Sequence, residues 1–227
     1  EFRRVLFRSL VEGGWKLKAI HRLMLLSATY QQSVTRPDQP EADAADPVNR
    51  LLRRFNRRRL SAEEIRDAML AAAGRLNTSI GGASVMIAVD PELTKLLYKP
   101  TQWTVTRDPS EHHRRSIYLI AKRNLRLPFM EVFDQPALLT STGRRESSTH
   151  APQALEMMNG AIANSLASAF ALRLGGHGGR PPAEQADLAF WLALGRAPTA
   201  TELERSIAFL SQHPVTEFAL ALFNLNA

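Results

Sequence analysis

Apolar residues recur every three or four positions along most of this chain, the spacing that places them on one face of an α-helix. The pattern runs over about residues 15–33, 62–75, 152–174, 183–194, 199–211 and 214–225. Two of these segments open with a hydroxyl residue and a glutamate three positions later, Ser61 with Glu64 and Thr199 with Glu202. That spacing is typical of a reciprocal helix cap. The chain is therefore predicted to fold mainly from helices.

The segments between these helices are long and rich in proline, glycine and charge. The spacing predicts polar loops over 34–47 and 134–151 and a glycine-rich link over 175–182. It also predicts an irregular stretch over 76–110 with one helical turn near 91–98. A short basic helix is expected over 48–56, and the one strand candidate is 116–121. We expect a mainly α fold, an irregular multi-helix domain with long ordered loops and at most a minor strand element.

Composition limits what the chain can be. Of its 227 residues, 44% are hydrophobic and 22% are charged, which is ordinary for a globular protein and unlike a disordered one. No apolar run approaches the roughly 20 residues of a membrane-spanning helix. The absence of cysteine excludes a disulfide, a thiolate metal site, a nucleophilic thiol and covalent haem attachment in this segment. The histidines lack metal-binding spacings, so we expect no metal site.

The first nine residues need separate treatment. They can be encoded, codon for codon, by the end of a widely used short-read sequencing adapter, and the chain does not begin with methionine. We therefore expect residues 1–9 to be an artefact and 10–227 to be a single helical domain, a fragment whose N-terminal domains are missing. Setting aside three Arg and one Glu lowers the net charge from +7 to +5, which still favours nucleic acid or an anionic surface as a partner.

A dense arginine cluster lies just before the helix predicted at 62–75. Its members are Arg50, Arg53, Arg54, Arg57, Arg58 and Arg59. Guanidinium groups match phosphate geometry, so this cluster could contact nucleic acid. Aromatic residues are scarce in it, however, and the acids Glu63, Glu64 and Asp67 follow directly and could neutralise it. Solvated or ion-paired arginines are the favoured interpretation, and nucleic-acid binding is the weakest of the functions considered.

Two carboxylates and a polar loop form the other candidate site. Glu131 and Asp134 would share a helix face and could divide acid and base roles, although acidic pairs at this spacing are commonly unreactive. The loop over 134–153 precedes a predicted helix N-terminus, which could hold an anionic group or be capped by a hydroxyl. An uncharacterised hydrolase would use Glu131 or Asp134 as acid or base, with Arg144 or Arg145 holding an anionic part of the substrate.

Motifs in order along nearly the whole chain after residue 9 resemble a known family, the planctomycete PSD-type domain of unknown function. They are Gly14-Trp15 with residues 21–33, Asn49-Arg50-Leu51-Leu52, residues 59–67, Gly81-Gly82-Ala83-Ser84-Val85, Arg114-Arg115-Ser116-Ile117-Tyr118, Phe133-Asp134-Gln135-Pro136, Arg144-Arg145, residues 149–155, Met158-Asn159 and residues 194–199. The chain ends at Ala227, a little before the family usually finishes.

The resemblance implies architecture more than chemistry. In that family this domain is the C-terminal module of large exported proteins, often with a c-type cytochrome domain or carbohydrate-binding-like modules upstream. It therefore implies an extracytoplasmic location, periplasmic or at the cell surface, and other domains of the same polypeptide as partners. It also implies that no cofactor lies in this segment and that any c-type haem lies in an upstream domain. The family has no established catalytic residues, so none is assigned.

The function expected from the sequence is an accessory, structural or interaction module of an exported, cytochrome-linked protein connected with polysaccharide use. A polysaccharide or anionic ligand would be bound by polar residues of the motifs, or the same residues would pair with one another inside the fold. These candidates are Arg114, Arg115, Asp134, Arg144, Arg145, His150 and Gln153. Whether the chain is catalytic at all stays open at this point.

Overall fold

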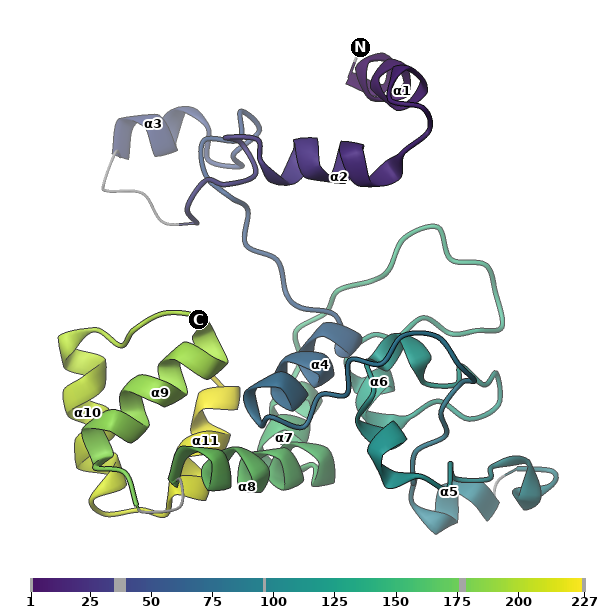
Figure 1. Ribbon diagram of the computed structural model, residues 1–227, viewed down its shortest axis with the longest axis vertical. Helices are drawn as coiled ribbons and strands as arrows, with labels where there is room; N and C mark the ends of the chain where they lie inside the picture. The colour runs from purple at the N-terminus through teal and green to yellow at the C-terminus, as the bar shows by residue number, and fades with distance from the viewer. Residues whose placement is uncertain (1, 35–39, 96, 176–178, 226–227) are drawn as a thin grey trace. The chain divides into compact units, whose positions relative to one another are not determined.

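The computed structural model describes residues 2–34, 40–95, 97–175 and 179–225. The chain divides into two compact units, unit 1 over Glu1–Arg59 and unit 2 over Leu60–Ala227 (Figure 1). Each unit has its own internal contacts, so the two are described separately. The expected start of the natural chain at residue 10 stays a prediction.

Unit 1 is a set of short helices joined by turns. Its described elements are α1 (Phe2–Glu12), α2 (Leu17–Leu25) and α3 (Pro40–Ala45). The rings of Phe7 and Trp15 meet edge-on with their centroids 6.3 Å apart, which ties α1 to the residues just before α2. No side chain of α2 is buried.

One helix prediction and one loop prediction in unit 1 need correction. The helix predicted over 15–33 is shorter, because Ser27 turns the chain after α2 and its Oγ donates to the Met24 carbonyl at 2.7 Å. The loop predicted over 34–47 contains the helix α3, and its residues 35–39 lie outside the described part of the chain. The acids and alanines of α3 are compatible with a helix once a proline supplies its first position.

The basic helix predicted over 48–56 does not form. Asn49 has a φ of 53°, outside the right-handed helical region. The Asp46 carboxylate accepts from the Arg50 amide at 2.9 Å, and Asn49 Nδ2 donates to the Arg54 carbonyl at 2.7 Å. Side chains of Asp and Asn thus offer the backbone partners that compete with helical hydrogen bonds, which is why this segment is a series of turns.

Unit 2 is mainly helical, as predicted. Its described elements are α4 (Ala62–Ala72), α5 (Pro91–Lys95), η1 (Pro100–Gln102), η2 (Pro109–His113), η3 (Ser116–Tyr118), α6 (Pro128–Val132), α7 (Ala151–Asn159), α8 (Ala161–Gly175), α9 (Pro182–Leu194), α10 (Ala200–Leu210) and α11 (Val215–Phe223), where η marks a 3₁₀ helix. Of the predicted glycine-rich link over 175–182, residues 176–178 lie outside the described residues. None of the described helices combines the length and apolarity that a bilayer crossing requires.

Local capping sets several helix ends where the sequence predicts them. Ser61 Oγ accepts from the Glu64 amide at 3.4 Å, and the Glu64 carboxylate accepts from the Ser61 amide at 2.8 Å. Thr199 and Glu202 form the same reciprocal pair at 3.3 and 2.7 Å. Gly195 follows α9 with a φ of 68°, a left-handed conformation that costs glycine little. The predicted starts of α4 and α10 and the predicted end of α9 are confirmed.

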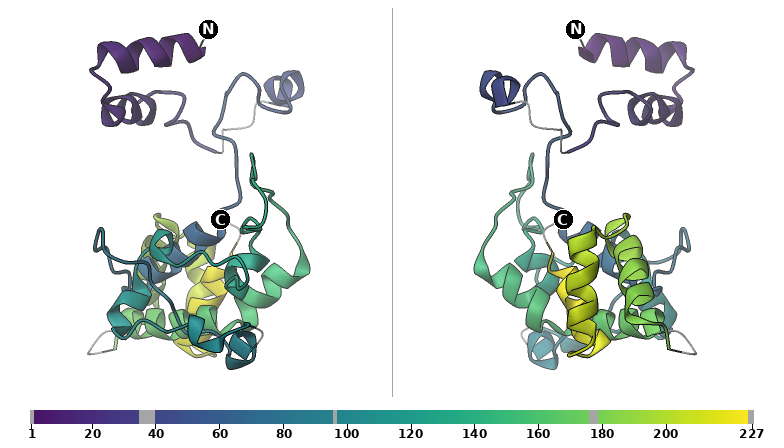
Figure 2. Two further views of the ribbon diagram at one scale, coloured as in Figure 1. Left: turned by 90° about the vertical axis from the view of Figure 1, so that its right-hand side faces the viewer. Right: turned by 90° about the vertical axis from the view of Figure 1, so that its left-hand side faces the viewer.

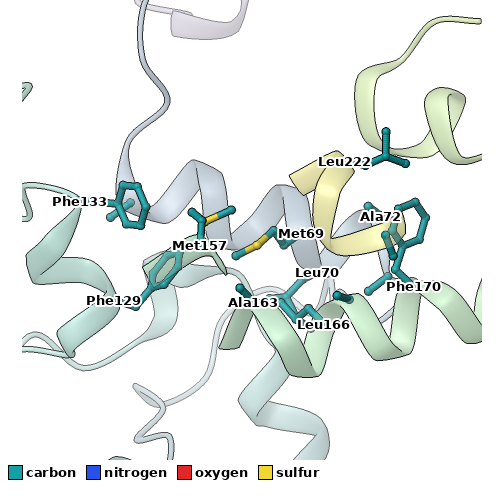
Figure 3. Close-up of a cluster of buried hydrophobic side chains, with 14 of the residues drawn as sticks. Met69, Leu70, Ala72, Phe129, Phe133, Met157, Ala163, Leu166, Phe170 and Leu222 are labelled. Atoms are coloured by element: carbon teal, nitrogen blue, oxygen red, sulfur yellow. The ribbon is translucent and has the colours of Figure 1, made fainter. Parts of the chain in front are cut away.

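The core of unit 2 surrounds α4. This helix contacts α6, α8, α9 and η3, and α8 packs against α11. α9 packs against α10, and the two helices lie side by side in the right-hand view of Figure 2. Figure 3 shows Met69 and Leu70 of α4 among Phe129 of α6, Phe133 just after it and the apolar side chains of α8. Leu70 is 2% exposed, and burying a side chain of that size contributes about 1.5–3 kcal/mol. α4 is therefore fixed on several sides at once.

The strand predicted over 116–121 is wrong. Its first residues form the 3₁₀ helix η3, and Leu119 makes an isolated bridge to Val85. The Val85 amide donates to the Tyr118 carbonyl at 2.7 Å, and the Ile120 amide donates to the Val85 carbonyl at 2.9 Å. The apolar and β-branched residues that favour a strand here pair across a single position, so within the described residues they build no sheet.

The single helix predicted over 152–174 is two helices, α7 and α8. The chain breaks at Gly160, whose ψ of 142° is extended. A continuous helix over 152–174 would turn Leu155 and Met158 inward, but on α7 they are 57% and 55% exposed while Gln153 is buried. A break in the helix removes the fixed angular relation between the residues on either side of it, so one apolar stripe does not continue through both helices.

Candidate functional site: the arginine network of unit 2

An extended polar cluster joins α4 to the segment from η2 to η3. It contains Arg66, Asp67, Arg114, Arg115 and Ser116, and is called the arginine network below. The Arg66 side chain is 5% exposed, and its guanidinium donates three hydrogen bonds to that segment. Nη1 donates to the Arg114 carbonyl at 3.0 Å and to Ser116 Oγ at 3.1 Å, and Nη2 donates to the His112 carbonyl at 2.6 Å.

Asp67 supplies the negative charge of the network. Its Oδ1 accepts from the amide and the hydroxyl of Ser116, both at 2.7 Å. The same carboxylate lies 3.7 Å from Arg66 Nη1, and its other oxygen lies 3.6 Å from Arg115 Nε. Burial lowers the pKa of Arg66, and Asp67 partly opposes this shift. Neighbouring residues of α4 thus hold one turn of the loop by its carbonyl, amide and hydroxyl groups.

Arg114 extends the network to the glycine-rich loop before α5. Its side chain is 3% exposed, pairs with Glu111 at 3.0 Å and lies over the Tyr118 ring, 3.9 Å from the centroid. The guanidinium also donates to the carbonyls of Ser79 and Gly81. Gly81 has a φ of 83°, a conformation that side chains rarely adopt. The backbone carbonyls of this loop therefore point toward Arg114, and the hydrogen bonds from its guanidinium hold the loop in place.

A second group of contacts fixes the polar loop between α6 and α7. Arg145 makes a two-pronged ion pair with Glu63 in the first turn of α4, at 2.6 and 2.7 Å. The Arg145 hydrogen bond lowers the pKa of Glu63, while the Glu63 hydrogen bond raises the pKa of Arg145. Asp134 accepts from the amide and the hydroxyl of Ser148, both at 2.8 Å. The loop is held at two places by its own side chains.

The predicted site residues do not converge on one cavity. Arg114 and Arg115 lie in the arginine network. The Arg145 side chain pairs with Glu63 in the first turn of α4, and Asp134 binds Ser148 within the polar loop. The other three candidates are distributed as follows: Gln153 is buried and donates to the Val132 carbonyl at 3.0 Å, whereas Arg144 and His150 are exposed. An open hollow on the loop is lined by Arg144, Arg145, Glu146, Ser147 and Ser148, so neither Asp134 nor His150 lines it.

The carboxylates considered for acid and base roles are engaged separately. Glu131 pairs with Arg126 at the end of α6, while Asp134 is bonded to Ser148. Asp134 has a φ of 61°, so the backbone leaves the helix before reaching it. The two side chains therefore do not share a helix face as the sequence predicted.

A small cavity of about 20 Å³ near Glu63 has room for about one water molecule.

The other sequence expectations concern metals and the arginine cluster. Among the described residues, no group of three or more His, Asp and Glu side chains could hold a metal ion. Burial, followed by the charges of Arg75 and Arg66, lowers the pKa of His113, which favours its neutral form. Each of the acids that follow the cluster over 50–59 has a partner inside unit 2: Glu63 binds Arg145, Glu64 caps α4 and Asp67 binds Ser116.

Sequence reasoning missed Arg66 and Asp67, the centre of the arginine network. A signal was present, because Arg66 lies four residues after Ala62 and three before Met69, both of which are buried on α4. A charged residue on an apolar helical stripe is rarely buried without partners. An apolar face traced through Ile65, Ala68, Met69 and Ala72 leaves Arg66 outside it. In the structure Met69 and Ala72 are buried, Ala68 is exposed and Arg66 occupies a buried position.

Comparison with known proteins gives one match. The family model described as "PSD1: Protein of unknown function (DUF1553)" matches residues 4–210. No curated protein and no solved structure matches this chain.

Proposed function

This chain belongs to the PSD1 family, a family of proteins of unknown function (DUF1553), and from that premise we propose that it is a noncatalytic module of a larger protein. The single observation that carries the proposal is the use of the charged motif residues as internal bonds. The guanidinium groups of Arg66, Arg114 and Arg145 bind carbonyls and carboxylates of their own unit.

Physical chemistry supports a structural role for such bonds. A buried guanidinium is costly to desolvate, and only good geometry with several acceptors compensates for that cost. Arg66 and Arg114 have such acceptors on segments far apart in the sequence, at separations of 46–50 and 33–35 residues. They act as clamps that replace the sheet or disulfide with which other folds secure long loops. Side chains committed in this way are poorly placed to meet a substrate.

The wider context is part of the same proposal and rests on the family resemblance. We place the module in an exported, extracytoplasmic protein with a c-type cytochrome domain elsewhere in the polypeptide and a role in polysaccharide use. Sequencing the complete gene tests this context. A signal peptide and a C-x-x-C-H haem motif outside the present segment are the expected result, and a complete gene that lacks both overturns this context.

The noncatalytic role is tested by activity and stability together. The full chain is assayed against nitrophenyl glycosides, esters and phosphates, in parallel with Asp134→Asn. Turnover should stay at the background of buffer in both proteins. A turnover that falls at least tenfold in Asp134→Asn, with an unchanged circular dichroism spectrum, overturns the proposal in favour of a hydrolase.

The structural role has its own readout. Asp67→Asn removes the charge that Ser116, Arg66 and Arg115 share, so it should lower the melting temperature by several degrees. Asp187→Asn changes an exposed aspartate of α9 in the same chemical way and should leave the melting temperature unchanged. Equal melting temperatures for the two variants would mean that the arginine network is not a structural clamp.

A further inference from the structure

The net charge of the chain lies entirely in unit 1. Unit 1 has 13 Lys and Arg against 6 Asp and Glu, a formal charge of +7, whereas unit 2 has 16 of each and is neutral. If residues 1–9 are set aside, unit 1 still carries +5. A unit with this excess of positive charge attracts anionic partners.

Unit 1 also exposes apolar side chains to an unusual extent. On and just after α2, Leu17, Leu23 and Leu26 are 61%, 58% and 59% exposed, and Met24 is 39% exposed. No residue of the helix is buried. Single exposed leucines are ordinary, but a helix with this many of them marks a surface that another phase or molecule covers.

Most apolar side chains of α2 lie on a different side from its basic ones. With 3.6 residues per turn, Leu17, Ile20, Leu23 and Met24 lie on one side, whereas Lys18 and Arg22 follow each other one turn apart on the other, with Leu25 beside Lys18. A short, strongly amphipathic helix with lysine and arginine on its polar side is typical of segments that lie in the plane of a membrane surface.

Aromatic residues flank this helix. Trp15, two positions before α2, is 65% exposed, and Tyr30, after its C-terminal end, is 50% exposed. The Tyr30 ring meets Phe55 edge-on, with centroids 5.6 Å apart, next to the arginine cluster of unit 1. Tryptophan and tyrosine are enriched where hydrocarbon meets lipid headgroups, because one end of each side chain is apolar and the other is polar.

We propose that unit 1 binds the surface of a membrane containing anionic lipid, with α2 lying in the plane of the interface. The apolar face of α2 would enter the boundary of the acyl chains, and Lys18 and Arg22 would meet the headgroups. Exposed arginines of the cluster, such as Arg50 and Arg57, would add to the attraction. This inference concerns a different part of the chain from the arginine network and does not depend on the proposed noncatalytic role.

The observations favour lipid over the other anionic or apolar partners. Nucleic acid would use the positive charge but has no use for a row of exposed leucines. A second copy of this chain would cover the leucines but would bring the same positive charge into contact with itself. An anionic bilayer satisfies the charge, the apolar face and the flanking aromatic residues together.

Vesicle flotation with the full chain tests the proposal, because floating separates bound protein from aggregates. The probes are vesicles of phosphatidylcholine alone and vesicles of equal parts phosphatidylglycerol and phosphatidylcholine. Binding is expected only with phosphatidylglycerol and should weaken as salt is raised. Since each basic residue near an anionic surface contributes about 1 kcal/mol, the double variant K18E/R22E should bind at least about 30-fold more weakly.

Two further variants separate the apolar contribution from charge. Leu17→Ser with Leu23→Ser keeps every charge and should weaken binding about tenfold or more, since two apolar side chains no longer enter the interface. Leu139→Ser with Leu172→Ser changes two leucines of unit 2 that are 77% and 74% exposed, and should bind like the wild type. Circular dichroism should be unchanged in all of them, because none of these side chains is buried.

Tryptophan fluorescence provides a readout that needs no α2 variant. Vesicles containing phosphatidylglycerol should shift the emission to shorter wavelength. The shift should disappear in Trp15→Phe and persist in Trp191→Phe, whose tryptophan lies in unit 2 and is 53% exposed. A shift that Trp15→Phe leaves intact overturns the proposal.

Three other outcomes also overturn it. Equal binding to both kinds of vesicle would mean that charge is not recognised. Full binding by the serine variant, together with competition from a short DNA duplex, would identify unit 1 as a general polyanion-binding surface. A dimer in analytical ultracentrifugation that the serine variant dissociates, without vesicle binding, would identify the face as an interface between copies.

Discussion

Replacing Arg66 with methionine should destabilise unit 2 more than any substitution of an exposed arginine. The change keeps a long side chain but removes three donated hydrogen bonds and the charge opposite Asp67. Hydrogen bonds to a charged group are each worth about 1.5–3 kcal/mol, so the bonds alone total several kcal/mol. Methionine recovers part of this because burying the guanidinium is itself costly, as the lowered pKa of Arg66 indicates.

The net loss is expected to be about 3–5 kcal/mol, the range seen when one partner of a buried ion pair is removed. For a unit of this size, 1 kcal/mol corresponds to about 2–4 °C, so the melting temperature should fall by about 10 °C. Urea unfolding followed by circular dichroism measures the free energy, and calorimetry measures the temperature. Arg66→Lys should recover little, because one ammonium group cannot reach three acceptors arranged around a planar fork.

The control is Arg144→Met, which changes an exposed arginine of the polar loop and should alter stability by less than about 0.5 kcal/mol. A double-mutant cycle of Arg66→Met with Asp67→Asn should give a coupling energy of about 1–3 kcal/mol. A loss below about 1 kcal/mol for Arg66→Met would refute the view that the arginine network clamps the loop to α4.

Three further predictions concern helix ends and pH. Ser61→Ala removes the hydroxyl that caps α4 and should cost about 1 kcal/mol in urea unfolding; no change would show that the cap is dispensable. Gly160→Ala places a Cβ against the Glu156 carbonyl oxygen of α7 and should cost about 1–3 kcal/mol, whereas Gly143→Ala meets open space and should cost far less; equal costs would contradict the structure. The Arg196 hydrogen bond is the main cause that lowers the pKa of Glu202 from 4.5 to about 2. The small, solvent-screened stabilisation from this ion pair is therefore complete above pH 4.5 and lost as the pH falls toward 2. Arg196→Met should flatten that part of the melting-temperature profile, and an unchanged profile would count against the pair.

The sequence by itself determined which class of fold this is and where several helices begin and end. The capping pairs at Ser61 and Thr199 and the glycine after α9 act within a few residues, so their outcome depends little on the rest of the chain. Helical periodicity predicted most helices of unit 2, because it too depends on residues only a few positions apart. It failed where local side chains competed with the helix, as Asp46 and Asn49 do, and where one glycine interrupted an otherwise continuous stripe.

The tertiary structure decided what the polar residues do. Arg66 meets the Arg114 carbonyl across a separation of 48 residues, and Arg145 meets Glu63 across 82. No local pattern specifies such pairs, because their geometry depends on how α4 is packed among the helices around it. The sequence named Arg114 and Arg145 as candidates for binding, and only the folded chain shows that their guanidinium groups bind the protein itself.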